Sequence, residues 1–287
     1  MKILISTGIY PPKTSGPAQY AKNMHDIWTS SGYDVKVKTY DIENKLPSGI
    51  RHLYYFFKIL PSVIKSDFVF TLDTFSVGLP TAMACALFNK KFIIRTGGDF
   101  LWEGYVERTG DLVLLKDFYK TRIDNLNLKE KIIFNLTKWV LNKTDILIFS
   151  TEWQKDIFME PYELQKKDND GKIKIVENRY GEKEINDTQS FDTIKNFDFI
   201  ASTRVLKWKN IDFLKKIFDS EELKSKGVRL ITQEMKYDDF MNAMKKSYAT
   251  ILISLGDISP HMILDSIRLN KPFIITQENG LLNRIER

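Results

Sequence analysis

Two aspartates eight residues apart form the clearest chemical pattern in this chain. Asp257 follows the apolar run Tyr248–Leu255, which predicts a buried strand, and Asp265 lies within the helix expected next. Ser259 stands at the expected N-cap of that helix, and Pro260 at its first position, where a missing N–H costs nothing. A helix start at the end of a parallel strand attracts anions, whereas carboxylates prefer hydroxyl groups. The pattern therefore predicts a ligand with phosphates and sugar hydroxyls, such as a nucleotide sugar.

Two cations follow an earlier predicted strand of the same half of the chain. Arg204 and Lys209 come after the strand expected at 197–202, where a strand gives way to a helix. Two fixed cations there neutralise a diphosphate without a metal ion, and they stabilise the charge that grows on a leaving diphosphate. Taken alone, such a pair also suits an ordinary charged surface. His261, in the first turn of the expected helix, is a further candidate for contact with a phosphate.

Around these residues, predicted strands and helices alternate along the chain. We predict strands at 2–6, 34–40, 67–72, 91–95, 145–150, 172–177, 197–202, 228–232, 248–255 and 273–276. We predict helices at 16–31, 50–65, 78–88, 129–142, 151–159, 210–218, 237–246 and 260–270, with a short last helix beginning near Asn279. Such alternation is typical of parallel sheets with helices on both faces, that is, of an α/β fold.

A polar stretch without periodicity divides the alternating series into two. We therefore expect an N-terminal Rossmann-like domain at 1–180, a linker at 181–196 and a C-terminal domain at 197–287 that holds the nucleotide sugar. Two such domains create a crevice between two sets of strand ends, where ligands of open α/β sheets bind.

Composition and charge limit the classes of function. Apolar residues make up 43% of the chain, so a large core is expected. Residues 1–150 contain 20 Lys and Arg against 14 Asp and Glu, whereas the remainder is balanced. This excess favours either an anionic partner, such as a phosphorylated acceptor or a membrane face, or simply a surface of solvated lysines. The charges are spread out and no nucleic-acid motif occurs, so no nucleic-acid partner is expected.

The aromatic, basic segment Arg51–Lys65 has two interpretations. It suits either a helix lying on an anionic bilayer or an amphipathic helix packed on the first sheet, and we favour the second. The single cysteine, Cys85, predicts a buried apolar residue and suits a reducing compartment. We expect a cytoplasmic protein, and a position at the inner membrane face remains open. No spacing of His, Cys and carboxylates is typical of a metal site, and we expect no metal and no cofactor.

The ordered set of motifs resembles a known enzyme family. Arg204-x4-Lys209-Asn210, then Asp257-x7-Asp265 followed by Lys271-Pro272-Phe273-Ile274, is similar to the donor domain of group 1 (family 4) glycosyltransferases of the GT-B fold. Further similarities cover nearly the whole chain: Pro11-Pro12 and Ser15-Gly16 after the first strand, Gly97-Gly98-Asp99, and Glu177-Asn178 before the linker.

The resemblance implies a role for each matching residue. Arg204 and Lys209 would hold the donor diphosphate, Asp257 the donor sugar and Asp265 the ribose. Gly16 would let the backbone approach the ligand, and Asp99 would lie near the acceptor. The implied reaction is metal-independent transfer of a sugar, with retention at the anomeric carbon, from a nucleotide-sugar co-substrate to an acceptor on the first domain.

Two departures from the family leave an alternative open. The family usually has glutamate where this chain has Asp257 and Asp265, and the shorter side chain changes the reach to a hydroxyl by about 1.5 Å. The sequence also stops at Arg287, where family members usually continue with further donor-domain elements, so either a truncation or a compact variant is expected. The alternative is therefore a non-catalytic nucleotide-sugar-binding or scaffold protein of the same fold.

Overall fold

The computed structural model describes residues 1–13, 16–178, 197–201, 206–233 and 235–285. The expected linker at 181–196, Ser15 and Arg204 lie outside the described residues. The chain divides into two compact units. The first comprises Met1–Leu101 and Arg122–Glu177, and the second comprises Trp102–Thr121 and Asn178–Arg287.

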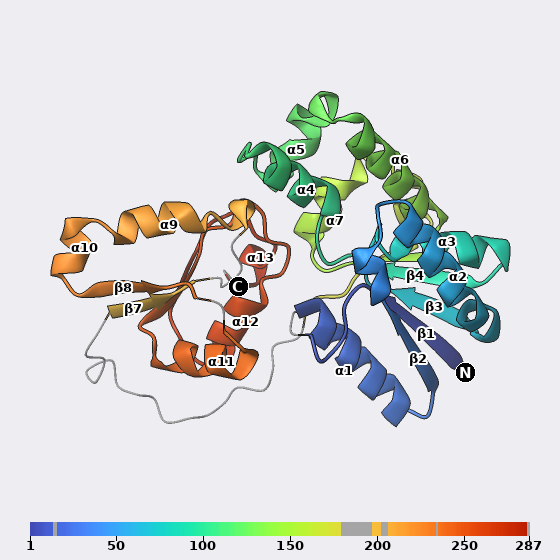
Figure 1. Ribbon diagram of the computed structural model, residues 1–287, viewed down its shortest axis with the longest axis horizontal. Coiled ribbons are helices and arrows are strands. Elements are labelled where there is room, and N and C mark those ends of the chain that lie inside the picture. The colour runs from blue at the N-terminus through green and yellow to red at the C-terminus, as the bar shows by residue number, and fades with distance from the viewer. Residues whose placement is uncertain (14–15, 179–196, 202–205, 234, 286–287) are drawn as a thin grey trace. The chain divides into compact units, whose positions relative to one another are not determined.

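The first unit is built on a parallel sheet of six strands in the order β2-β1-β3-β4-β5-β6 (Figure 1). Its strands are β1 (Lys2–Thr7), β2 (Asp34–Thr39), β3 (Phe68–Thr71), β4 (Lys91–Arg95), β5 (Ile146–Phe149) and β6 (Ile173–Ile175). The central strands are almost wholly buried because helices cover both faces of the sheet, as in other parallel sheets.

The helices of the first unit connect these parallel strands. They are α1 (Gly16–Ser30), η1 (Ile42–Lys45), α2 (Ile50–Lys65), α3 (Gly78–Leu87), η2 (Ile123–Asn125), α6 (Leu128–Lys143), α7 (Glu152–Met159) and α8 (Gln165–Asn169). Helix α2 packs beside α3, and α3 beside α6. Helix α1 lies on the opposite face of the sheet from α2, α3 and α6. The chain steps from β1 to β2 in one direction and through the later strands β3, β4 and β5 in the opposite one, and right-handed crossovers in opposite directions place their helices on opposite faces.

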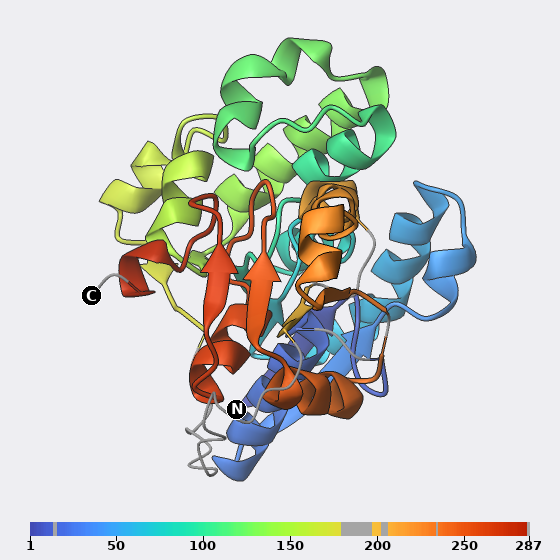
Figure 2. The same cartoon turned by 90° about the vertical axis from the view of Figure 1, so that its left-hand side faces the viewer.

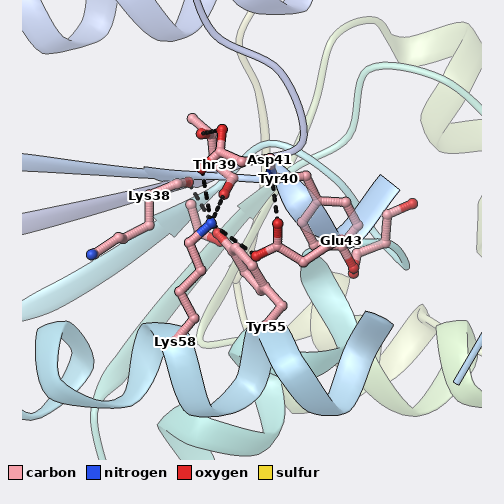
Figure 3. A network of polar contacts seen from close by, with 9 residues as sticks. Lys38, Thr39, Tyr40, Asp41, Glu43, Tyr55 and Lys58 are labelled. Atoms are coloured by element: carbon pink, nitrogen blue, oxygen red, sulfur yellow. Dashed lines mark hydrogen bonds and ion pairs between the residues drawn. The ribbon is translucent and has the colours of Figure 1, made fainter. Parts of the chain in front are cut away.

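A polar network fixes α2 to the end of β2 (Figure 3). The Nζ of Lys58 donates to the carbonyl of Thr39 at 2.8 Å and lies 2.9 Å from a carboxylate oxygen of both Asp41 and Glu43. The Tyr55 hydroxyl donates to the carbonyl of Lys38 at 3.0 Å. Glu43 is fully buried, so its charge is compensated by the Lys58 ammonium and by the backbone N–H of Asp41. The inner face of α2 is therefore held in one orientation.

The second unit contains a parallel sheet of four strands in the order β10-β9-β7-β8. Strands β10 and β9, in red and orange-red, are seen from the front in Figure 2. Its strands are β7 (Phe197–Ile200), β8 (Val228–Ile231), β9 (Ala249–Leu252) and β10 (Phe273–Ile275). Its helices are α4 (Phe100–Thr109, all but its first two residues), α5 (Leu115–Thr121), η4 (Lys207–Lys209), α9 (Ile211–Phe218), α10 (Glu221–Ser225), α11 (Tyr237–Lys246), α12 (His261–Arg268) and α13 (Leu282–Ile285).

Strand β9 contributes to two apolar clusters of the second unit, one on each face of its sheet. Ile251 packs in a cluster with Ile211 and Leu214 of α9, whereas its neighbour Leu252 packs with Ile263 of α12. Adjacent residues of a strand point to opposite faces, so α9 and α12 cover the two faces of the sheet. The predicted α/β fold with two Rossmann-like units is confirmed.

Residues 102–121 belong to the second unit, although the boundaries expected from the sequence include them in the first domain. The Leu115 N–H donates to the Leu255 carbonyl at 3.1 Å, and the Trp102 and Trp208 rings lie 5.5 Å apart. The Lys207 N–H donates to a Glu107 carboxylate oxygen at 2.7 Å. Helices α4 and α5 therefore pack against the segments that follow β7 and β9, at the carboxyl end of the second sheet, and their contact residue Leu255 lies two positions before Asp257.

Gly256 allows this packing, and its replacement should disturb it. A Cβ at Gly256 would lie 2.4 Å from the Leu115 Cβ and 3.2 Å from the Trp102 Cη2. We expect Gly256→Ala to lower the free energy of unfolding by about 1–3 kcal/mol, the usual range for overpacking. The matched control is Gly104→Ala, since a Cβ at Gly104 meets nothing within 4 Å. Urea denaturation of both variants measures the difference, and equal stabilities would contradict the packing described.

Candidate functional site

The backbone around Asp257 is fixed by the segment that follows β10. Asp257 forms a parallel bridge with Asn279, its N–H donates to the Glu278 carbonyl at 3.0 Å, and its carbonyl accepts the Gly280 N–H at 2.9 Å. The chain beyond β9 and the chain beyond β10 thus continue side by side past the sheet. Asp257 is held at the carboxyl edge, where open parallel sheets bind ligands.

The structure brings Lys209 and Asp257 together. The Lys209 Nζ forms an ion pair with the Asp257 Oδ2, and the two side chains are only 9% and 13% exposed. The same Nζ lies 4.3 Å from the centre of the Trp208 ring, and the Trp208 carbonyl accepts the Leu255 N–H at 2.8 Å. A lysine and an aspartate predicted separately to contact a diphosphate and a sugar are therefore one nearly buried pair.

Helix α12 begins one residue later than predicted. Pro260, in an extended conformation, is the N-cap, and His261 is the first helical residue. The expectation that Ser259 caps this helix is wrong, because the Ser259 hydroxyl lies 2.9 Å from the Asn178 Nδ2 and accepts its N–H instead. The first N–H groups of a helix lack intrahelical acceptors, so the start of α12 remains suited to an anion.

Asn178 contacts the start of α12, although sequence analysis assigned it only a place in the family pattern. Besides its bond to Ser259, its Nδ2 lies 3.3 Å from the His261 Nε2, and its carbonyl accepts an N–H from Arg284 at 3.0 Å. Asn178 therefore connects the start of α12 with α13, and it is nearly buried. Its place just before the polar stretch was the one available signal.

Asp265 lies one turn into α12, and its Oδ1 is 4.0 Å from the Arg268 Nε. If Asp265 binds the ribose of the donor, the ribose should lie beside the first turns of α12. Arg204 lies outside the described residues, so its placement relative to Lys209 remains a prediction.

Glu278 adds a further acidic side chain that sequence patterns did not single out. Its Oε1 forms an ion pair with Lys116 of α5, whereas its buried Oε2 has no hydrogen-bond partner among the described residues. Its carbonyl holds the Asp257 N–H, so it also supports the site through the main chain. No signal was available for this residue, because its role depends on the packing of α5.

The two candidate residues of the first unit lie at the carboxyl edge of its sheet. Gly16 is the first residue of α1, after β1. Asp99 follows β4 and is buried, and its Oδ1 accepts the Leu101 N–H at 3.1 Å near the start of α4. This contact indicates a structural contribution of Asp99 to the helix start.

Arg95 provides a cation at the same edge. Its guanidinium lies 4.0 Å above the Tyr20 ring, and Tyr20 is one turn along α1 from Gly16. Burial lowers the pKa of the Arg95 guanidinium, and the nearby Tyr20 acts in the opposite direction. The carboxyl edge of the first sheet therefore combines a helix start with a fixed positive charge.

Comparisons with known proteins define the fold. The chain resembles sucrose-phosphate synthase from Thermosynechococcus elongatus, with a TM-score of 0.67 and 9% identity over 99% of this chain and 83% of that one. It resembles WaaG, a glycosyltransferase involved in lipopolysaccharide biosynthesis, with a TM-score of 0.66 and 11% identity over 99% and 83%. No family model matches the chain, and no curated protein matches it by sequence.

A third similar structure has another activity. UDP-GlcNAc 2-epimerase from Methanocaldococcus jannaschii, also described in complex with UDP-GlcNAc and UDP, has a TM-score of 0.54 and 14% identity over 100% of this chain and 87% of that one. These likenesses show that the chain has the GT-B fold, with its two Rossmann-like units. Since the fold serves more than one reaction, the activity must be argued from the residues of the site.

Proposed function

We propose that this protein is a glycosyltransferase that moves a sugar from a nucleotide-sugar donor to an acceptor, without a metal ion and with retention at the anomeric carbon. The observation that supports this most strongly is the nearly buried Lys209–Asp257 pair beside the start of α12. It combines a fixed cation, a carboxylate and the start of a helix, which complement phosphates and hydroxyls together.

In this proposal, different residues contact the diphosphate and the sugar of the donor. The bond that breaks joins the anomeric carbon to a diphosphate oxygen, and negative charge grows on that oxygen. Lys209, with Arg204 and the N–H groups at His261 and Met262, stabilises that charge. Because an ammonium has three N–H donors, Lys209 holds Asp257 and a phosphate oxygen at the same time. Asp257 then accepts hydrogen bonds from the donor sugar.

The remaining site residues position the donor and the acceptor. Asp265 accepts from the ribose, and Ser259 and His261, both in contact with Asn178, orient the start of α12 toward the phosphates. On the first unit, Gly16 and Asp99 border the acceptor, for which Arg95 favours an anionic or lipid-linked molecule. Among the described residues, no helix is long and apolar enough to cross a membrane.

Measurement of sugar release and transfer tests the proposed activity. We expect slow release of sugar from one nucleotide sugar in a panel, and faster turnover when a suitable acceptor is added. Binding of the donor with no release or transfer under any condition would favour the non-catalytic alternative, which the two aspartates in place of glutamates also support.

Chelation of divalent ions tests the metal-free reaction. Side-chain cations and a helix start take the place of a divalent ion in the proposed site, so donor binding and turnover should be unchanged in excess EDTA. Turnover measured in EDTA and again after addition of Mg²⁺ or Mn²⁺ decides the point. Activity that disappears in the chelator and returns with either metal would contradict this mechanism.

A further inference from the structure

Helix α2 has an exposed apolar stripe on the face opposite its packed side. Tyr55, Ile59 and Val63 are fully buried against the first unit, as expected for a helix packed on the sheet. The apolar stripe consists of five exposed residues that recur at helical spacing, namely Ile50, Leu53, Tyr54, Phe57 and Ile64. Leu53 and Phe57 are 58% and 63% exposed. A soluble surface seldom leaves so many large apolar side chains together without a partner.

The helices beside α2 extend this surface. On α3, Met83 and Leu87 are exposed, and on α6, Leu128 and Ile132 are exposed. Since α2 packs beside α3, and α3 beside α6, the three helices form one layer over the sheet. Their exposed residues point away from the sheet, on the outer surface of that layer.

The charge of this layer is one-sided. Together α2, α3 and α6 contain seven Lys and Arg but a single acidic residue, Glu130, which is buried in the capping box of α6. Lys58 forms ion pairs with Asp41 and Glu43, and Lys138 forms one with Glu163. The other five basic residues of these helices are Arg51, Lys65, Lys129, Lys131 and Lys143. Helix α1, on the other face of the sheet, has balanced charge, with Lys22 paired to Asp26.

We propose that the outer surface of α2, α3 and α6 docks on an anionic lipid bilayer. The apolar stripe would enter the boundary between headgroups and acyl chains, while the lysines of α6 and the end of α2 contact lipid phosphates. The polar network at Lys58 and Tyr55 holds α2 in the orientation that presents the stripe, so docking requires no rearrangement of the helix. Docking does not depend on sugar transfer, and it is measured without any nucleotide.

Co-sedimentation with vesicles tests the proposal. The full chain should sediment with vesicles of equal parts phosphatidylcholine and phosphatidylglycerol, much less with phosphatidylcholine alone, and less as the salt concentration rises. Leu53→Glu with Phe57→Glu should weaken binding by at least about tenfold, because two apolar contacts are lost and two negative charges are added. Lys129→Gln with Lys131→Gln should weaken it by about fivefold or more.

Helix α9 of the second unit provides matched controls. Phe213 and Ile217 are 52% and 40% exposed at the same i, i+4 spacing, and Lys215 and Lys216 are exposed beside them. Phe213→Glu with Ile217→Glu, and Lys215→Gln with Lys216→Gln, should bind vesicles like the unmodified chain. Circular dichroism and thermal melting confirm that each variant is folded.

Several results would overturn the proposal. The unmodified chain could remain in the supernatant with anionic vesicles, or the α2 and α9 variants could lose binding equally. A concentration-dependent dimer that the α2 variant abolishes, without vesicle binding by the unmodified chain, would instead assign the stripe to a protein interface. Sugar transfer that persists in solution while vesicle binding is absent would reject the docking surface and leave the proposed activity intact.

Discussion

Lys209→Ala should both destabilise the second unit and abolish donor binding. The Lys209 ammonium and the Asp257 carboxylate form a nearly buried ion pair, so removal of the cation leaves an uncompensated charge. We expect the free energy of unfolding to fall by about 3–5 kcal/mol, which is typical when one partner of a buried pair is removed. Urea denaturation and calorimetry with a nucleoside diphosphate measure the two effects.

A double variant separates the structural effect from the binding effect. Lys209→Met with Asp257→Leu replaces the ion pair with apolar side chains of similar size, and such replacements are often neutral or stabilising. We expect its stability to return close to that of the unmodified chain while diphosphate binding stays lost. A double variant that binds the diphosphate normally would remove Lys209 from the donor site.

Asp257→Asn and Asp265→Asn should have different binding profiles. If Asp257 contacts the sugar, its variant should weaken binding of the nucleotide sugar and barely affect the nucleoside diphosphate. If Asp265 contacts the ribose, its variant should weaken both ligands. A carboxylate accepts hydroxyl hydrogen bonds at two oxygens and an amide at one, so each loss should be about 1–3 kcal/mol, or roughly ten- to hundredfold in affinity.

Calorimetry with both ligands on both variants provides the comparison. Asp239→Asn, an exposed carboxylate on α11, is the matched control and should bind like the unmodified chain. Because Asp257→Asn also leaves the Lys209 charge without its partner, its unfolding is measured alongside. Identical profiles for the two variants, or unchanged binding in both, would argue against the donor site.

Much of the fold could be predicted because its elements have local signals. The helix at Ile50–Lys65 and the strand at Lys91–Arg95 have the predicted bounds, since their apolar spacing and flanking residues agree. Helix α7 lies within the helix predicted at 151–159, and the Thr151 hydroxyl caps it by accepting the Gln154 N–H. Helices α4 and α5 were not predicted, because their residues are short amphipathic runs whose packing partners lie a hundred or more positions away.

The candidate site was less predictable for the same physical reason. The spacing of Asp257 and Asp265 was visible, whereas the Lys209–Asp257 ion pair joins residues 48 positions apart and depends on how η4 meets β9. Pro260 rather than Ser259 is the N-cap of α12. The Ser259 hydroxyl instead accepts a hydrogen bond from the Asn178 Nδ2, 81 positions earlier in the chain. Local patterns identify residues that are able to do chemistry, but only tertiary contacts decide which of them act together.

Titration of the unmodified chain with nucleotides tests most directly whether the second unit is a nucleotide-sugar site. The measurement is calorimetric, in EDTA, with UDP, GDP and ADP and with a nucleotide sugar of each base. We predict that the ligands of one base bind, both the nucleoside diphosphate and the nucleotide sugar. The double variant Lys209→Met with Asp257→Leu should remove both binding signals. Absence of binding for every ligand, or equal binding by the double variant, would contradict the proposed site.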